Sequence, residues 1–435
     1  MTGPRPARRL VIVVRADPVI CGHSGEARNL AEVALLRGFD EVRIVTWPID
    51  VLEASGLPLK PLDSVLPYSD GIIVERPDPV GDYKVPDARY YAGLVGRLVE
   101  LFTDGVPTVC MSLYLMPHTL AVHEALAVAR ATGLPVDVTT IAEAVGSDIT
   151  NVVRHSVEEQ LFGAAAQVFA AYLSSDVCVA VSAFTKRLIV ESAVAIDVLH
   201  GTRFADQCRE RIAVSYPAID SATFTDLDPC DTARALQRRG LEHTGYVLFL
   251  SRVTKAKGVD DLIDGYAASH ARHRVRLVIA GSGPESSALR ARAAASSAAD
   301  RITFLDDVDD DEKRHLMAAC AAYVLPSKPR PEFVETFGIA LVEKMLSGGG
   351  PVITTSTGGI PEAIGEHGVV VPVGDPMAIA KALDDAIVRS SPADHRQRAA
   401  AALAHGLQFD RVNVFDRLFA RLQDSVTTDS VTSGV

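Results

Sequence analysis

The chain has 435 residues, of which 48% are hydrophobic and 23% are charged, and its formal net charge at pH 7 is -12. A chain of this length predicts two or three domains rather than one core. The acidic balance argues against a nucleic-acid partner, which needs a basic face. The sequence contains no run of about 18 apolar residues, so we expect no membrane partner.

The cysteines indicate the redox compartment. They are scattered without a CxxC spacing, and several lie inside apolar runs, as small core residues do. Such usage is typical of a reducing compartment. The apolar run at 10–14 is too short for a signal-peptide core. We therefore expect a cytoplasmic protein with neither a disulfide framework nor a zinc site. The six are Cys21, Cys110, Cys178, Cys208, Cys230 and Cys320.

The first half of the chain alternates apolar strands with helical segments rich in alanine, leucine and valine. A loop at 21–25 separates the first strand from a helix expected at 26–37. Such alternation predicts a parallel sheet with right-handed crossovers. The expected strands are 10–14, 41–46, 71–74, 108–111, 136–139 and 177–181.

The second half repeats this scheme after a stretch, 198–229, that has few long helical patterns. We predict an α/β protein with a first domain at 1–225 and a second at 226–408. A helix at 409–424 then returns to the first domain, and 425–435 is a loose tail. A ligand is expected between the domains, at the carboxyl ends of the strands. The expected strands are 246–251, 276–281, 302–305, 322–325 and 351–355.

The most informative stretch is 331–361, in which Glu335 and Glu343 stand eight positions apart around a helix start. At about 100° per residue, eight steps give two turns plus roughly 80°, so the two carboxylates point in similar directions. The unpaired amides near Gly338 suit a phosphate. Carboxylates beside a phosphate suit sugar hydroxyls, and a nucleotide sugar offers both groups. On this pair alone, an amphipathic helix with two solvated glutamates remains the alternative.

Three further loops of the second half carry polar or glycine signals. Arg252 and Lys257 place two cations on the loop after the first strand, where a solvated basic loop is the alternative. Gly281 and Ser282 follow the next strand without a GxGxxG spacing, so the glycines indicate a tight turn or a close approach. The acidic run at 306–312 resembles a metal site by composition, but acidic residues favour the first turn of a helix, which is the reading we prefer.

The motifs together resemble those of the retaining glycosyltransferases of the GT-B fold, family 4 type. That signature is Glu-x7-Glu with Phe-Gly after the first Glu, then Gly-Gly-x-Pro-Glu. Here it falls on Glu335, Phe337, Gly338 and Glu343, followed by the run 358–362. The resemblance implies two Rossmann-like domains facing across a cleft. It also implies a hexosyltransferase-type enzyme that needs no metal and uses a nucleoside-diphosphate sugar as co-substrate.

The resemblance also assigns roles to residues. Arg252 and Lys257 hold the diphosphate with the amides around Gly338, Glu335 holds hydroxyls of the transferred sugar, and Glu343 accepts from the ribose. Glu335, Arg252 and Lys257 are the expected catalytic residues. The other nucleotide-sugar-binding residues expected are Gly22, Gly25, Gly281, Ser282, Phe337, Gly338, Ile339 and Glu343.

The loop of Gly22, His23 and Gly25 occupies the place of the family's Gly-Gly stretch near the diphosphate and acceptor. His23 and His118 could each line the cleft or be satisfied structural residues. The family commonly has a histidine just after the strand at 136–139, which contacts the donor sugar near its 6-position. Here none occurs until His155. Either the chain is a degenerate relative or its donor differs at that end, and we prefer the second.

The resemblance extends to the S-glycosyltransferases of lincosamide antibiotic assembly. It favours GDP as the nucleotide, with a GDP-octose as one candidate donor. The acceptor is expected to be small and soluble, with the thiol of ergothioneine as one candidate. The alternatives are an O-glycosyltransferase acting on a sugar or cyclitol, a nucleotide-sugar epimerase, and a non-catalytic nucleotide-sugar-binding relative. A homodimer is one option for its assembly.

Overall fold

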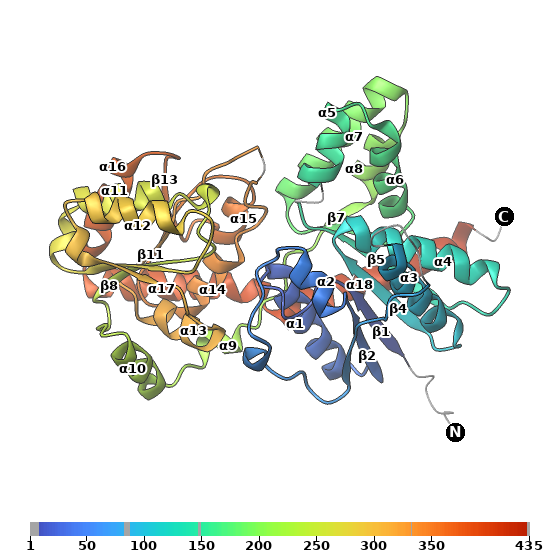
Figure 1. Cartoon of the computed structure of the whole chain (residues 1–435), viewed down its shortest axis with the longest axis horizontal. Helices are drawn as coiled ribbons and strands as arrows, with labels where there is room; N and C mark the ends of the chain where they lie inside the picture. Colours follow the sequence, from blue (N-terminus) through green and yellow to red (C-terminus); the bar gives the residue numbers. More distant parts are fainter. Residues whose placement is uncertain (1–7, 82–87, 147–148, 332, 433–435) are drawn as a thin grey trace. The chain divides into compact units, whose positions relative to one another are not determined.

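The computed structural model of the chain describes residues 8–81, 88–146, 149–331 and 333–432. The chain divides into two compact units. Unit 1 comprises Met1–Ile219 and Arg411–Val435, and unit 2 comprises Asp220–Asp410. The boundaries thus lie at 219 and 410, where the sequence had suggested 225 and 408. Figure 1 shows the elements of both units.

Unit 1 contains a seven-stranded parallel sheet in the order β3-β2-β1-β4-β5-β6-β7. Two of its strands differ from the sequence-based expectation. β5 runs farther than the expected 136–139, and β7 was not expected, because three residues are too few to show a pattern. The strands are β1 (Arg9–Val13), β2 (Glu41–Val45), β3 (Ile72–Glu75), β4 (Thr108–Leu113), β5 (Val138–Ala144), β6 (Val177–Ala180) and β7 (Ile212–Val214).

Helices cover both faces of this sheet. Alternate residues of a strand point to opposite faces. Accordingly, Ile12 packs in the core beneath α1, whereas Val11 and Val13 pack in the core beneath α3 and α4. The helices are α1 (Gly22–Leu36), α2 (Ile49–Ala54), α3 (Ala88–Thr103), α4 (Leu120–Ala131), α5 (His155–Glu158), α6 (Phe162–Leu173), α7 (Ala183–His200), α8 (Phe204–Arg211) and α18 (Arg411–Thr432).

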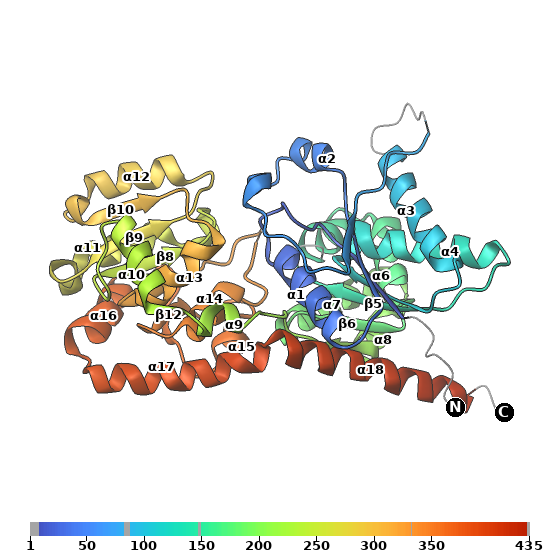
Figure 2. The same ribbon diagram turned by 90° about the horizontal axis from the view of Figure 1, so that it is seen from below.

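The last helix, α18, follows unit 2 in the chain but packs within unit 1, beside α1 (Figure 2). Phe415 is buried there, with its ring edge-on to Phe39 at 6.3 Å between centroids. Arg37 of unit 1 forms an ion pair with Asp416 at 2.5 Å. The helix continues to Thr432, where the sequence analysis had expected a tail from 425, because neither glycine nor proline interrupts it. Residues 433–435 of that tail lie outside the described residues.

Unit 2 contains a six-stranded parallel sheet in the order β10-β9-β8-β11-β12-β13. β13 was not expected from the sequence, again because it has only three residues. The strands are β8 (Tyr246–Leu250), β9 (Arg276–Ala280), β10 (Ile302–Leu305), β11 (Ala322–Leu325), β12 (Val352–Thr355) and β13 (Val369–Val371).

Helices α11 and α12 cover one face of this sheet, and α13, α14 and α17 cover the other (Figure 1). Both units are thus doubly wound, and the α/β fold with two Rossmann-like domains expected from the sequence is confirmed. The helices of unit 2 are α9 (Ala222–Thr225), α10 (Pro229–Arg238), α11 (Val259–Ala268), α12 (Ser286–Ala295), α13 (Asp310–Ala319), α14 (Ile339–Ser347), α15 (Ile360–Ile364), α16 (Pro376–Asp384) and α17 (Pro392–Gly406).

Two chain-wide expectations can be compared with the structure. None of the helices among the described residues is both long enough and apolar enough to cross a membrane. All six cysteines are free thiols. Cys110, Cys178, Cys208 and Cys320 are buried, as expected of small core residues, whereas Cys21 is half-buried and Cys230 is exposed.

Candidate functional site

The sheet of unit 2 has a topological switch point between β8 and β11. From β8 the chain proceeds outward to β9 and β10, and from β11 it proceeds outward on the other side to β12 and β13. In open parallel sheets, ligands bind outside the carboxyl ends of the strands at such a point. The loops that leave it are 251–258 after β8 and 326–338 after β11. They carry the cations and one of the two glutamates singled out in the sequence.

Lys257 and Glu335 meet at this edge. The Lys257 Nζ donates a hydrogen bond to Glu335 Oε2 at 2.5 Å, and the lysine is only 6% exposed. The ammonium also lies 5.0 Å from the centre of the Phe333 ring. An ammonium has three N–H groups and a carboxylate has two oxygens. The pair therefore retains donors and an acceptor for a ligand.

Glu343 lies on α14 and pairs with a residue that the sequence analysis missed. Lys313 Nζ, on α13, donates to Glu343 Oε1 at 2.9 Å. Both side chains are partly exposed. Lys313 follows the acidic run at 306–312 directly, and that run had drawn attention away from it. The only sequence signal for this lysine is its position in the first turn of the helix.

The start of α14 corrects the helical argument made from the sequence. α14 begins at Ile339, four residues after Glu335, and Gly338 is its N-terminal cap with φ of 105°. Glu335 lies before this left-handed residue and outside the helix, so helical periodicity does not set the angle between Glu335 and Glu343. The helix-start amides remain next to Glu335 in sequence. Phe337 is buried with its ring edge-on to Phe409, so only its main chain is available to a ligand.

The loop after β12 fixes the main chain of Glu335. The N–H of Gly359 donates to Glu335 O at 2.9 Å. A Cβ added at Gly358 would lie 1.9 Å from Glu335 O, and one at Gly359 would lie 2.0 Å from Thr336 O. In unit 2 the close approach is to the segment that carries Glu335.

Arg252 occupies the loop after β8 and is exposed. Its neighbour Val253 donates its N–H to Ser282 O at 2.9 Å, and a Cβ added at Gly281 would lie 2.2 Å from Ser251 O. The glycine therefore lets two loops stack and places Ser282 beside Arg252 along the same edge. Within the part of the chain that the structure describes, the Arg252 guanidinium has neither an ion pair nor a hydrogen bond.

The acidic run caps a helix, as the preferred reading of the sequence expected. Asp309 accepts the N–H of Glu312 at 2.7 Å and caps α13. Arg239 binds Glu312 at 2.6 Å and Asp307 at 2.9 Å. Three carboxylates of the acidic run, those of Asp307, Asp309 and Glu312, thus serve in helix capping or ion pairing.

In unit 1 the sequence-predicted residues Gly22 and Gly25 lie in the first turn of α1, not in a preceding loop. The buried Asp17 holds this turn, since it accepts hydrogen bonds from Ser24 at 3.3 Å and from Arg28 at 2.9 Å. A Cβ added at Gly25 would meet no described atom within 4 Å. Packing in unit 1 therefore does not require a glycine there, which leaves room for a ligand beside a helix N-terminus.

His118 is a satisfied structural residue. Its Nδ1 contacts Leu113 O at 2.7 Å, and its Nε2 accepts a hydrogen bond from Trp47 Nε1 at 3.1 Å. Burial lowers the pKa of His118 to about 4, so the ring stays neutral at physiological pH. Both ring nitrogens are occupied within unit 1, so we assign this residue no ligand.

The strand matched to the family's histidine ends later than expected. β5 extends to Ala144, so the residues at its carboxyl end are Glu143 and Ala144 rather than Thr139. Glu143 is buried, 1% exposed. The sequence analysis did not place Glu143 at the end of this strand, because Thr139, Thr140 and Ala142 make the strand less apolar than its neighbours.

Part of the chain is similar in sequence to a described protein family. Residues 234–403 match the model of the family described as glycosyl transferases group 1. The matched residues all lie within unit 2. The match spans the switch-point loops and both glutamates.

Two curated relatives show the range of similar proteins. A D-inositol 3-phosphate glycosyltransferase of Acidothermus cellulolyticus is 30% identical over 231 residues, which cover 50% of this chain and 49% of the relative. A GDP-mannose-dependent alpha-(1-6)-phosphatidylinositol monomannoside mannosyltransferase of Mycobacterium tuberculosis is 30% identical over 237 residues, covering 52% of this chain and 59% of the relative. The chain thus spans about half the length of the curated relatives it matches.

Solved structures share the fold along nearly the whole chain. Anabaena Alr3699/HepE, solved with UDP and glucose, superposes with a TM-score of 0.67 at 18% identity and covers 96% of this chain and 99% of its own. WaaG, a glycosyltransferase involved in lipopolysaccharide biosynthesis, has a TM-score of 0.61 at 17% identity, covering 94% and 98%. The GT-B type of fold expected from the sequence is confirmed by these matches.

Proposed function

We propose that this protein is a retaining glycosyltransferase that moves a sugar from a nucleoside-diphosphate sugar to a small acceptor. The observation that carries the proposal is the arrangement at the switch point of unit 2. There the Lys257–Glu335 pair, the helix start at Gly338 and the exposed Arg252 follow neighbouring parallel strands. Cations and helix-start amides suit a diphosphate, and the carboxylate suits sugar hydroxyls.

In this proposal Arg252, Lys257 and the amides around Gly338 hold the diphosphate. Glu335 binds hydroxyls of the transferred sugar through the oxygen that Lys257 does not occupy. Glu343 binds the ribose through Oε2, since Oε1 already accepts from Lys313. Ser282 lies along the same edge, beside the nucleotide. In unit 1, which receives the acceptor, Gly22 and Gly25 in the first turn of α1 offer amides to a substrate group.

The reaction follows from charge placement. The bond between the anomeric carbon and the diphosphate oxygen breaks, and its electron pair goes to the diphosphate. The acceptor atom bonds on the same face of the sugar, and its proton passes to a phosphate oxygen of the leaving group. Each charge-assisted hydrogen bond to that group contributes about 1.5–3 kcal/mol, and groups fixed beforehand are the most effective. Because side chains and amides supply this stabilisation, the proposal assigns no metal.

The comparisons support particular substrates to try first. The mycobacterial relative is described as GDP-mannose-dependent, which supports GDP as the leading nucleotide. The names of the relatives refer to inositol phosphate and phosphatidylinositol, so a cyclitol or sugar hydroxyl is the first acceptor class to test. A GDP-octose donor with the thiol of ergothioneine as acceptor, as in antibiotic biosynthesis, is the second.

Nucleotide binding is tested by thermal unfolding with GDP, UDP, ADP and TDP in turn. Binding at a hundredfold excess over Kd stabilises the native state by about 2.7 kcal/mol. We expect one base to give this shift, with GDP first. Arg252→Ala should reduce the shift, whereas Lys255→Ala, which removes an exposed cation from the same loop, should leave it unchanged. No shift with any of the four nucleotides would refute the proposal.

Transfer is tested with Glu335→Gln, which keeps the shape of the side chain and removes its charge. We expect this variant to bind the nucleotide like the parent and to lose most transfer to the acceptor. Parental turnover in Glu335→Gln would contradict the role of Glu335. Formation of an epimer from the donor alone would favour a nucleotide-sugar epimerase. Nucleotide binding without transfer to any acceptor would favour a non-catalytic relative.

A further inference from the structure

A second cluster of polar side chains lies at the switch point of the unit 1 sheet. Here the chain leaves β1 toward β2 on one side and β4 toward β5 on the other. His23 and Glu26 lie in the first turns of α1, which follows β1, and Glu143 lies near the carboxyl end of β5. Each residue offers one potential ligand atom, a ring nitrogen or a carboxylate oxygen, and these three atoms all lie within 4.8 Å of one another. The rule that located the site in unit 2 points to the same edge here.

The cluster is buried and one of its oxygens has no hydrogen bond. Glu26 is 2% exposed, and its Oε1 accepts the N–H of Ala218 at 3.2 Å. Its Oε2 has no hydrogen-bond donor among the described residues, and the His23 Nδ1 at 3.8 Å is its nearest ion-pair partner. Burying a carboxylate oxygen without a donor is costly. Native proteins retain such an atom when it has a functional partner.

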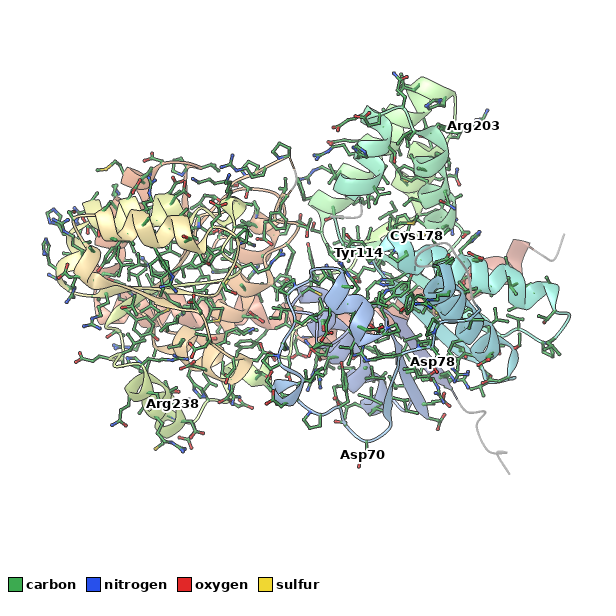
Figure 3. All side chains as sticks on the ribbon, in the orientation of Figure 1. Asp70, Asp78, Tyr114, Cys178, Arg203 and Arg238 are labelled. Carbon is green, nitrogen blue, oxygen red and sulfur yellow. The ribbon has the colours of Figure 1, made fainter. Side chains whose placement is uncertain are left out.

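The walls around the cluster suit a cation. Tyr114 follows β4 and donates its N–H to Glu143 O at 3.0 Å, and Figure 3 shows it beside β5. Its ring lies 6.5 Å from that of His23 and 6.3 Å from that of His118, which is neutral and has both nitrogens engaged. The Arg15 guanidinium lies over the Tyr114 ring at 4.7 Å but forms no ion pair with Glu26. Two carboxyl groups beside aromatic faces attract a positive charge.

The spacing of the ligand atoms fits an organic cation. A divalent transition metal binds its oxygen and nitrogen ligands at about 2.1 Å, so two ligand atoms can be at most about 4.2 Å apart. A charged nitrogen donates hydrogen bonds of about 2.8 Å and can bridge oxygens up to about 5.6 Å apart. Ligand atoms that all lie within 4.8 Å of one another are within the reach of one charged nitrogen.

We propose that His23, Glu26 and Glu143 bind a positively charged nitrogen group, an ammonium or a quaternary ammonium, carried by one of the two substrates. The identification of the carrier as a substrate rests on the proposed function. An ammonium donates to the Glu26 and Glu143 carboxylates and to the His23 ring nitrogen. A quaternary ammonium instead lies against the aromatic faces while the carboxylates balance its charge. The cluster would then select an amino-bearing sugar or a cationic acceptor over neutral analogues.

The test measures binding of simple probes to the full chain by calorimetric titration without nucleotide. Glucosamine is compared with glucose, and choline with 3,3-dimethylbutan-1-ol, in which a neutral carbon replaces the charged nitrogen. We expect at least tenfold tighter binding of one cationic probe than of its neutral counterpart. A preference for glucosamine assigns the cation to an amino sugar, and a preference for choline assigns it to a quaternary ammonium acceptor. Equal binding within both pairs, or no binding of either cation, would overturn the proposal.

Three variants locate the effect. Glu26→Gln and Glu143→Gln should each abolish the preference for the cation, whereas Glu191→Gln, at an exposed position on α7, should retain it. Circular dichroism checks that each variant is folded, and the comparison of cationic with neutral probes in the parent needs no variant. Tighter binding of Mn²⁺ or Zn²⁺ than of either organic cation, lost in the same variants, would replace the proposal with a metal site. Because no nucleotide is present, the outcome is independent of whether the nucleotide test succeeds.

Discussion

Glu335 is placed through its main chain as well as through its ion pair. Its carbonyl oxygen receives the N–H of Gly359, and Gly358 passes so close that an added Cβ would lie 1.9 Å away. Gly358 also has a φ of 60°. A side chain at this position would therefore push on the segment whose carboxylate we assign to the transferred sugar. The glycine pair supports the site without touching a ligand.

We predict that Gly358→Ala destabilises the fold and disturbs Glu335. A left-handed backbone costs a non-glycine residue about 1–2 kcal/mol, and forcing extra atoms into a packed site costs about 1–3 kcal/mol more. Gly374→Ala is the matched control, because Gly374 has a similar φ of 72° and no described atom within 4 Å of an added Cβ. Chemical denaturation of both variants separates backbone strain from the clash. Equal losses in the two variants would show that the clash does not matter.

At the scale of an element, α14 presents two different faces. Glu343 lies on the face that carries the proposed ribose contact, whereas the next residue, Lys344, is 1% exposed. Lys344 Nζ donates to Gly348 O at the end of the same helix. Burial lowers the pKa of Lys344 below its ordinary value of 10.5. The helix thus buries one lysine as a cap for its own carboxyl end.

This burial predicts a dependence of stability on pH. In the window below 10.5 the unfolded chain binds more protons at Lys344 than the native chain does, so this residue makes stability rise as pH rises. Lys344→Met should remove that contribution, and the stability of the parent relative to the variant should increase between about pH 7 and about pH 10. Urea unfolding across this range measures the difference. Lys381→Met, at an exposed lysine on α16, should show a flat difference. A flat difference for Lys344→Met as well would contradict the expected proton linkage.

The sequence predicted elements well where hydrophobic patterns were long. Continuous apolar runs located the central strands of both sheets, because parallel strands are buried on both faces. The sequence analysis missed β7 and β13, because a strand of three residues is too short to show a periodic pattern. These two strands are defined only by their pairing with β6 and β12. The sequence analysis also ended β5 too early, because two threonines near the start of that strand and a glutamate near its carboxyl end interrupt the apolar run.

The candidate site was predictable only in part, for related reasons. The motif around Glu335 and Glu343 lies within one stretch of chain, so its residues could be named together. The partner of Glu343, Lys313, belongs to another helix and carries no spacing signal. The cluster of His23, Glu26 and Glu143 joins segments far apart in the sequence, and only the order of strands in the sheet reveals it. The burial of His118, which decided its role, could not be predicted from the sequence either.

At the scale of the whole molecule, unit 1 is discontinuous and unit 2 is inserted into it. Ile219 and Arg411 are separated in sequence by all of unit 2, yet the N–H of Arg411 donates to Ile219 O at 2.7 Å. The two segments of unit 1 that flank the insertion therefore lie side by side. Helix α18, which follows Asp410, completes the core between α1 and the sheet with Val414, Phe415 and Leu418.

This arrangement predicts that unit 1 folds without unit 2 but not without α18. Burying each of these three side chains stabilises by about 1.5–3 kcal/mol, about 4.5–9 kcal/mol together, which is comparable to the whole stability of a typical domain. A chain of residues 8–219 joined to 411–432 by a short Gly-Ser linker should unfold cooperatively in thermal melts followed by circular dichroism. Residues 8–219 alone should lack a cooperative transition and aggregate in gel filtration. If this fragment melts as the fused chain does, α18 is dispensable. If the fused chain also fails to fold, unit 1 depends on unit 2 for more than the delivery of its last helix.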